Sequence, residues 1–78
     1  MKDVNTSLGP AAIAEMGDNE YWMYFNGHAV GRIRKTQTFS WECLCGTDFS
    51  NPKSVHIHPS FESAELELTF CIEEGAVS

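Results

Sequence analysis

The dipeptide Asn26-Gly27 is the feature that most constrains the fold of this 78-residue chain. A run of large aromatic and apolar residues, 21–25, leads into it, and a second strand-like run follows it. Both residues of Asn-Gly tolerate the positive φ angles of a type I′ turn, so this pattern is the strongest short-range signal for a β-hairpin. The sequence therefore predicts two antiparallel strands, 21–26 and 28–34, joined by a tight turn.

The apolar residues of this hairpin do not alternate strictly. A β-bulge at Gly31 would return Ile33 to the face that carries Met23 and Val30, so we expect a bulge there. The first strand is apolar on both faces. It should therefore be central in a sheet, or covered by the N-terminal segment.

Four further segments carry weaker patterns. Residues 10–16 favour a short helix, because proline suits the first helical turn and alanine has a high helix propensity. Residues 38–45 and 55–58 alternate between apolar and polar side chains, which predicts strands. Residues 1–9 are polar and are expected to form a flexible tail.

The C-terminal segment fits two structures. As a strand, residues 64–73 alternate between apolar and polar side chains with one small residue out of place. As a helix, residues 61–74 have one apolar stripe, but Leu66 and Phe70 then lie on the opposite face. The period-two count favours the strand.

Together these segments predict one small domain over residues 1–78, of the α+β and mainly β class. It would have four to five antiparallel strands and a short N-terminal helix. The alternative is a helix over 61–74, packed on a three- to four-stranded sheet. Exposed strand edges leave room for a homodimer.

The charge of the chain restricts its partners. Five basic residues against eleven acidic residues give a formal net charge of −6, which disfavours direct binding to nucleic acid or an anionic membrane. The sequence has no run that approaches the ~20 apolar residues of a membrane span, and its first residues lack the order of a signal peptide. Three cysteines, an odd number, do not indicate a disulfide framework. We therefore expect a cytoplasmic protein with reduced thiols and a basic protein partner.

Five glutamates and no basic residue lie between positions 61 and 74. Along a strand, several of these carboxylates would line one face and could imitate the charge of a nucleic-acid backbone, although a plainly solvated face is also compatible. Tyrosine and tryptophan are favoured interface anchors, so the hairpin aromatics are expected to contribute. The predicted partner-binding residues are Glu62, Glu65, Glu67, Glu73, Glu74, Tyr21, Trp22 and Tyr24.

Two pairs of metal-binding side chains have strand spacing. Residues i and i+2 project from the same face of a strand, so Cys43 with Cys45, and His56 with His58, could converge from neighbouring strands. Two thiolates and two imidazoles are a ligand set for tetrahedral zinc. The Cys-x-Cys spacing is tighter than that of zinc fingers, however, and if both strands turned their apolar residues inward, the histidines would point outward. Zinc bound by these four residues is therefore an alternative to a domain without a cofactor.

Catalytic motifs are absent from the sequence, which has no nucleophile elbow, P-loop, glycine-rich dinucleotide motif or His-Glu-x-x-His. We expect a non-enzymatic protein. A small thiol- or histidine-dependent enzyme using Cys43 or Cys71 remains the alternative in this class.

Residues 22–33 resemble the opening hairpin of many small bacterial and prophage proteins. In size and acidity the chain is also similar to phage-encoded inhibitors of the anti-CRISPR type. That resemblance implies an inhibitor in the host-cell cytoplasm that occupies a basic, nucleic-acid-binding surface of another protein. It assigns no role to any individual residue.

Overall fold

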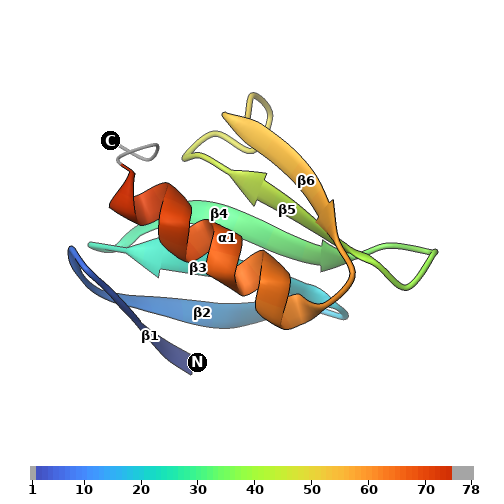
Figure 1. Cartoon of the computed structure of the whole chain (residues 1–78), viewed down its shortest axis with the longest axis horizontal. Helices are drawn as coiled ribbons and strands as arrows, with labels where there is room; N and C mark the ends of the chain where they lie inside the picture. Colours follow the sequence, from blue (N-terminus) through green and yellow to red (C-terminus); the bar gives the residue numbers. More distant parts are fainter. Residues whose placement is uncertain (1, 75–78) are drawn as a thin grey trace.

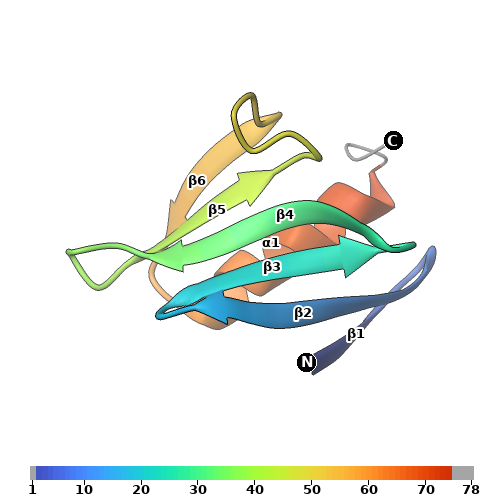
Figure 2. The same ribbon diagram turned by 180° about the vertical axis from the view of Figure 1, so that it is seen from behind.

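The chain forms two layers, a six-stranded antiparallel sheet and a helix packed across one face of it (Figure 1). A computed structural model describes residues 2–74. The strands lie in the sheet in the order of the sequence. The elements are β1 (Lys2–Thr6), β2 (Gly9–Gly17), β3 (Glu20–Phe25), β4 (His28–Lys35), β5 (Trp41–Cys45), β6 (Ser54–His58) and α1 (Phe61–Glu73). Figure 2 shows the face of the sheet that α1 does not cover.

The predicted hairpin is β3 and β4. Asn26 has a φ of 53° and Gly27 a φ of 79°, as a type I′ turn requires. A register shift after Met23 leaves Val30 as the extra residue of β4, beside Gly31. The predicted bulge is therefore confirmed, and Ile33 lies with Met23 and Val30 in the same buried core, as expected.

The predicted N-terminal helix over 10–16 is wrong, because these residues form most of β2. The helix propensity of alanine is worth only tenths of a kcal/mol per residue. Here β2 pairs with β1 on one side and with β3 on the other, and it buries Ala11 and Ile13. Sheet pairing and burial outweigh propensity. The predicted tail, 1–9, likewise contributes the edge strand β1, while Met1 lies outside the described residues.

The predicted strand over 64–73 is also wrong, and the alternative of a helix over 61–74 is confirmed by α1. The backbone N–H of Ser63 donates to the side-chain oxygen of Ser60, at 3.2 Å, so Ser60 is the N-cap. Ala, Glu and Leu, all strong helix formers, fill the middle of the segment. The sheet beneath α1 has six strands, more than either prediction gave.

The core lies between α1 and the sheet, and a glycine sets how closely the two layers approach. A Cβ atom at Gly31 would overlap the end of the Leu68 side chain and lie 3.0 Å from the Leu44 carbonyl oxygen. The buried core residues are Ala11, Ile13, Met23, Val30, Ile33, Cys43, Cys45, Ala64, Leu68, Cys71 and Ile72.

A disulfide between Cys45 and Cys71 joins β5 to the last turns of α1. The expectation of three reduced cysteines is therefore wrong for this pair, and Cys43 is the remaining free thiol.

Candidate functional site

Exposed apolar side chains lie between carboxylates on the side of α1 that faces away from the sheet. Leu66 is 55% exposed and Phe70 is 50% exposed. Their neighbours on this side, Glu62 and Glu74, are also exposed. The core is formed by the opposite side of α1, where Ala64, Leu68, Cys71 and Ile72 are buried. The exposed apolar pair is therefore not needed for the packing of α1 on the sheet. We call Glu62, Leu66, Phe70 and Glu74 the outer helix surface.

The five predicted glutamates are not equally available. Glu65 forms an ion pair with Lys2 of β1, at 3.1 Å. Glu73 accepts a hydrogen bond, 2.8 Å long, from a backbone N–H in the β1–β2 turn. Both contacts fasten α1 to the sheet's first edge. Glu62 and Glu74 are the exposed members of the set.

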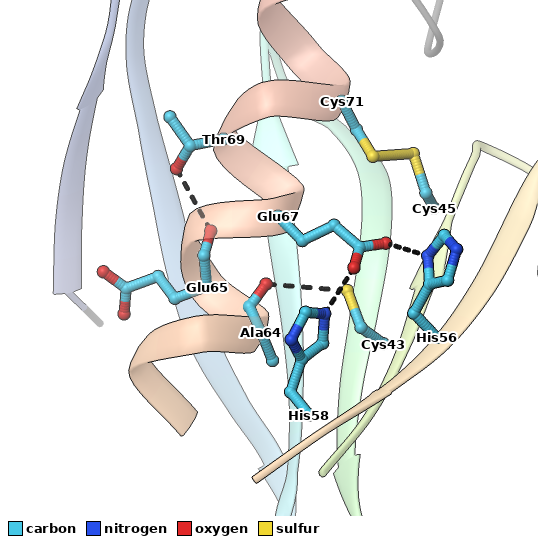
Figure 3. Close-up of a disulfide and its surroundings, with 9 residues drawn as sticks. All are labelled: Cys43, Cys45, His56, His58, Ala64, Glu65, Glu67, Thr69 and Cys71. Carbon is cyan, nitrogen blue, oxygen red and sulfur yellow. Dashed lines mark hydrogen bonds and ion pairs between the residues drawn. A yellow bond between two sulfur atoms is a disulfide. The ribbon is translucent and has the colours of Figure 1, made fainter. Parts of the chain in front are cut away.

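Glu67 fastens α1 to the opposite edge of the sheet (Figure 3). The Nδ1 of His56 lies 2.6 Å from one carboxylate oxygen, and the Nε2 of His58 is hydrogen-bonded to the other. Partial burial raises the pKa of Glu67. The hydrogen bonds and charges of the two histidines lower this pKa by more, so that it lies below its ordinary value. The carboxylate therefore stays ionised and holds β6 against the helix.

The histidines point toward the helix and not outward. His56 lies opposite Cys43 in the β5–β6 ladder, so its side chain is on the cysteine face. The apolar residues of β6 point the other way, and Val55 and Ile57 are 49% and 58% exposed on the uncovered face. The idea that both apolar faces turn inward fails because Glu67 gives the histidines a polar partner on the helix side.

The four predicted zinc ligands are not assembled as one ligand set. Cys45 is in the disulfide, and Cys43 Sγ donates to the backbone oxygen of Ala64, at 3.5 Å. Both histidines are engaged by the Glu67 carboxylate, as Figure 3 shows. Among residues 2–74, no group of three or more His, Cys, Asp or Glu side chains is arranged to hold a metal ion.

The thiol of Cys43 has the wrong environment for a nucleophile. The residue is fully buried. Burial first, and the negative charge of Glu67 second, raise the pKa of this thiol to about 12. The reactive thiolate is therefore a negligible fraction at neutral pH. Cys71, the other predicted thiol, is in the disulfide.

The aromatic residues predicted to bind a partner project from both faces of the sheet. Tyr21 packs edge-to-face against Phe61 at the start of α1, with ring centroids 4.9 Å apart, so it belongs to the core side. Trp22 and Tyr24 lie on the uncovered face, where Trp22 packs against Phe49 at 5.1 Å. A flat partner surface cannot contact these two aromatics and the outer helix surface together.

Leu66 and Phe70 are the residues that the sequence reasoning missed. Two open grooves, of about 440 and 380 Å³, run between α1 and β6, and Glu67 and Phe70 line both of them. The signal was present in the sequence, because a helical arrangement places two large apolar residues opposite the buried stripe. The same pattern favoured a strand in the alternation count, and in the folded chain it forms the exposed apolar pair of the outer helix surface.

Comparisons with protein-family models, with curated proteins and with solved structures give no match to this chain. Within residues 2–74, no helix has the length and apolar character needed to cross a membrane.

Proposed function

We propose that this chain is a non-enzymatic, acidic protein-binding domain that occupies a basic, nucleic-acid-binding surface of a partner protein, as phage-encoded inhibitors of the anti-CRISPR type do. The observation that carries the proposal is the outer helix surface. Its exposed apolar pair, Leu66 and Phe70, stands on a segment that has five glutamates and no basic residue.

The apolar pair supplies a reason to bind. Complete burial of a Leu or Phe side chain is worth about 1.5–3 kcal/mol. About half of each side chain is still exposed here. A partner that covers both would therefore gain about 0.8–1.5 kcal/mol from each, or about 1.5–3 kcal/mol together, which is comparable to one anchor residue at an interface centre.

The carboxylates select the kind of partner. They repel phosphate groups and attract lysine and arginine, so they favour a basic protein over nucleic acid. Glu62 and Glu74, the exposed carboxylates of the outer helix surface, are separated by about 18 Å along the helix axis, at ~1.5 Å per residue. A charged surface of that length can oppose several side chains that would otherwise hold a nucleic-acid backbone.

The test compares two double variants as bait in affinity capture from nuclease-treated extract of the native host, with captured proteins identified by mass spectrometry. Leu66→Ser with Phe70→Ser removes the apolar anchor. Leu8→Ser with Met16→Ser is the matched control, because these residues are 58% and 47% exposed and are not part of the outer helix surface.

We expect the wild type and the control to capture a basic nucleic-acid-binding protein that the anchor variant loses. Added DNA or RNA should displace the captured protein, and affinity should fall steeply as ionic strength rises, because salt screens the carboxylates. A partner that both variants retain equally, or whose affinity is the same at low and high salt, would refute the proposal.

A further inference from the structure

The two edges of the sheet differ in their protection against strand pairing. Edge strands are commonly blunted by charged residues, and β1 carries Lys2 and Asp3 within its five residues. The opposite edge, β6, has no Asp, Glu, Lys, Arg or Pro residue between 54 and 58, and its two histidines are held by Glu67 on the helix face. It instead exposes Val55 and Ile57, two β-branched residues, side by side on the uncovered face.

We propose that β6 pairs with β6 of a second copy of this chain, antiparallel and centred on His56. In this register Val55 lies opposite Ile57 of the second copy, and Ile57 opposite its Val55. On the helix face, Ser54 lies opposite His58 of the second copy. The strand is thus self-complementary, with apolar residues meeting apolar residues and polar residues meeting polar ones.

Neighbouring registers lack this property. A shift of two residues in one direction places Ile57 opposite Lys53, and a shift in the other direction places Val55 opposite Pro59. A shift of one residue would bring Val55 opposite His56. Residues that lie opposite each other project from the same face of a sheet, so this register would turn the helix face of one copy toward the uncovered face of the other. Lys53 and Pro59 therefore bracket the strand and restrict pairing to the central register.

The contacts within each copy hold β6 ready for this pairing. On its inner side β6 is fully paired with β5 over all five residues. On its helix face, Glu67 fixes His56 and His58. A strand held in this way loses little conformational freedom when its outer edge is paired.

The resulting dimer has one continuous twelve-stranded sheet, with a two-fold axis perpendicular to it. Both α1 helices then lie on the same side. If the proposed function is correct, the dimer presents two outer helix surfaces to one partner assembly. The dimer itself does not depend on that function.

The test is the mass of the protein in solution, measured by light scattering after gel filtration, from micromolar to millimolar concentration. Ile57→Lys places a charge on the edge, and Leu8→Lys is the control on an equally exposed residue, since both are 58% exposed. The wild type and Leu8→Lys should approach twice the chain mass of 8.7 kDa, whereas Ile57→Lys should stay at the chain mass with an unchanged circular dichroism spectrum.

Cysteine cross-linking tests the register. A chain with both Val55→Cys and Ile57→Cys should form a covalent dimer under mild oxidation, because these positions face each other across the two-fold axis. Val55→Cys alone should cross-link much more slowly. A wild type that stays at the chain mass at every concentration, or an Ile57→Lys variant that remains dimeric, would overturn the proposal. So would equal cross-linking by the single and double cysteine variants. None of these outcomes depends on the function proposed for α1.

Discussion

Replacing Gly31 with alanine tests how closely α1 packs on β4. The new methyl group would overlap the end of the Leu68 side chain, and the Leu44 carbonyl oxygen leaves no room behind it. Leu68 is only 1% exposed, so its side chain cannot swing into solvent. We expect Gly31→Ala to lower the free energy of unfolding by about 1–3 kcal/mol through overpacking.

A second substitution, Leu68→Ala, removes the side chain that the new methyl group would overlap and completes a double-mutant cycle. Leu68→Ala removes three carbon atoms, worth about 2.4 kcal/mol at ~0.8 kcal/mol each, and the cavity left behind raises the loss to about 3 kcal/mol. In a chain carrying both changes, the methyl at position 31 occupies part of the space that Leu68 vacates. The double variant should therefore be more stable than the sum of the single losses implies, by about 1 kcal/mol or more.

The assay is equilibrium unfolding in urea with the disulfide oxidised, followed by tryptophan fluorescence. Gly17→Ala is the control, because a Cβ there has no atom within 4 Å, and it should change stability by no more than about 0.5 kcal/mol. Additive losses in the double variant, within about 0.5 kcal/mol, would show that Gly31 and Leu68 do not meet and would refute this account of the helix packing.

Two further predictions concern the attachments of α1. Cys45 and Cys71 are 26 positions apart in the chain. On the chain-entropy estimate, reduction of their disulfide should lower the free energy of unfolding by about 3.5 kcal/mol. Identical urea midpoints with and without reductant would contradict this. The pKa of Glu67 is lowered in the folded state, so its contribution to stability is complete above the ordinary carboxyl value of 4.5 and is lost as pH falls through the lower folded value. Glu67→Gln should therefore flatten the loss of thermal stability on acidification below about pH 4.5, and parallel wild-type and variant profiles would show that the two histidine contacts add nothing.

Local backbone chemistry made the hairpin predictable. Asn26 and Gly27 tolerate positive φ without help from tertiary contacts, and the bulge beside Gly31 followed from the need to collect apolar residues on one face. By contrast, residues 10–16 were predicted as a helix from propensities worth tenths of a kcal/mol. The pairing of β2 on both sides overrides that preference and is not visible within the segment.

The helix over 61–74 was only the alternative, because the alternation count that favoured a strand took no account of the cap at Ser60. A serine before a run of strong helix formers is a start signal that outweighs two exposed apolar side chains. The disulfide could not be predicted from the sequence for a different reason. Cys45 meets Cys71 only once α1 lies across β5, and three cysteines allow several pairings.

The direction of the histidines also depends on a distant residue. His56 and His58 alternate with Val55 and Ile57, and nothing within the strand says which pair faces the core. Glu67, on an element formed later in the chain, decides it by accepting hydrogen bonds from both imidazoles. Sites built from such non-local partners are the part of this molecule that local patterns could not predict.

The sheet order has a consequence for how the molecule reaches this structure. Consecutive strands pair with each other along the whole sheet, from β1 to β6, so each step of sheet growth closes only a short loop. Folding by successive addition to the β3–β4 hairpin should therefore be fast for a β-rich domain. The helix is the exception, since α1 follows all six strands and packs back across the middle of the sheet. During synthesis the apolar face remains open until α1 has left the ribosome, and in that interval a nascent chain is most exposed to aggregation or to chaperones.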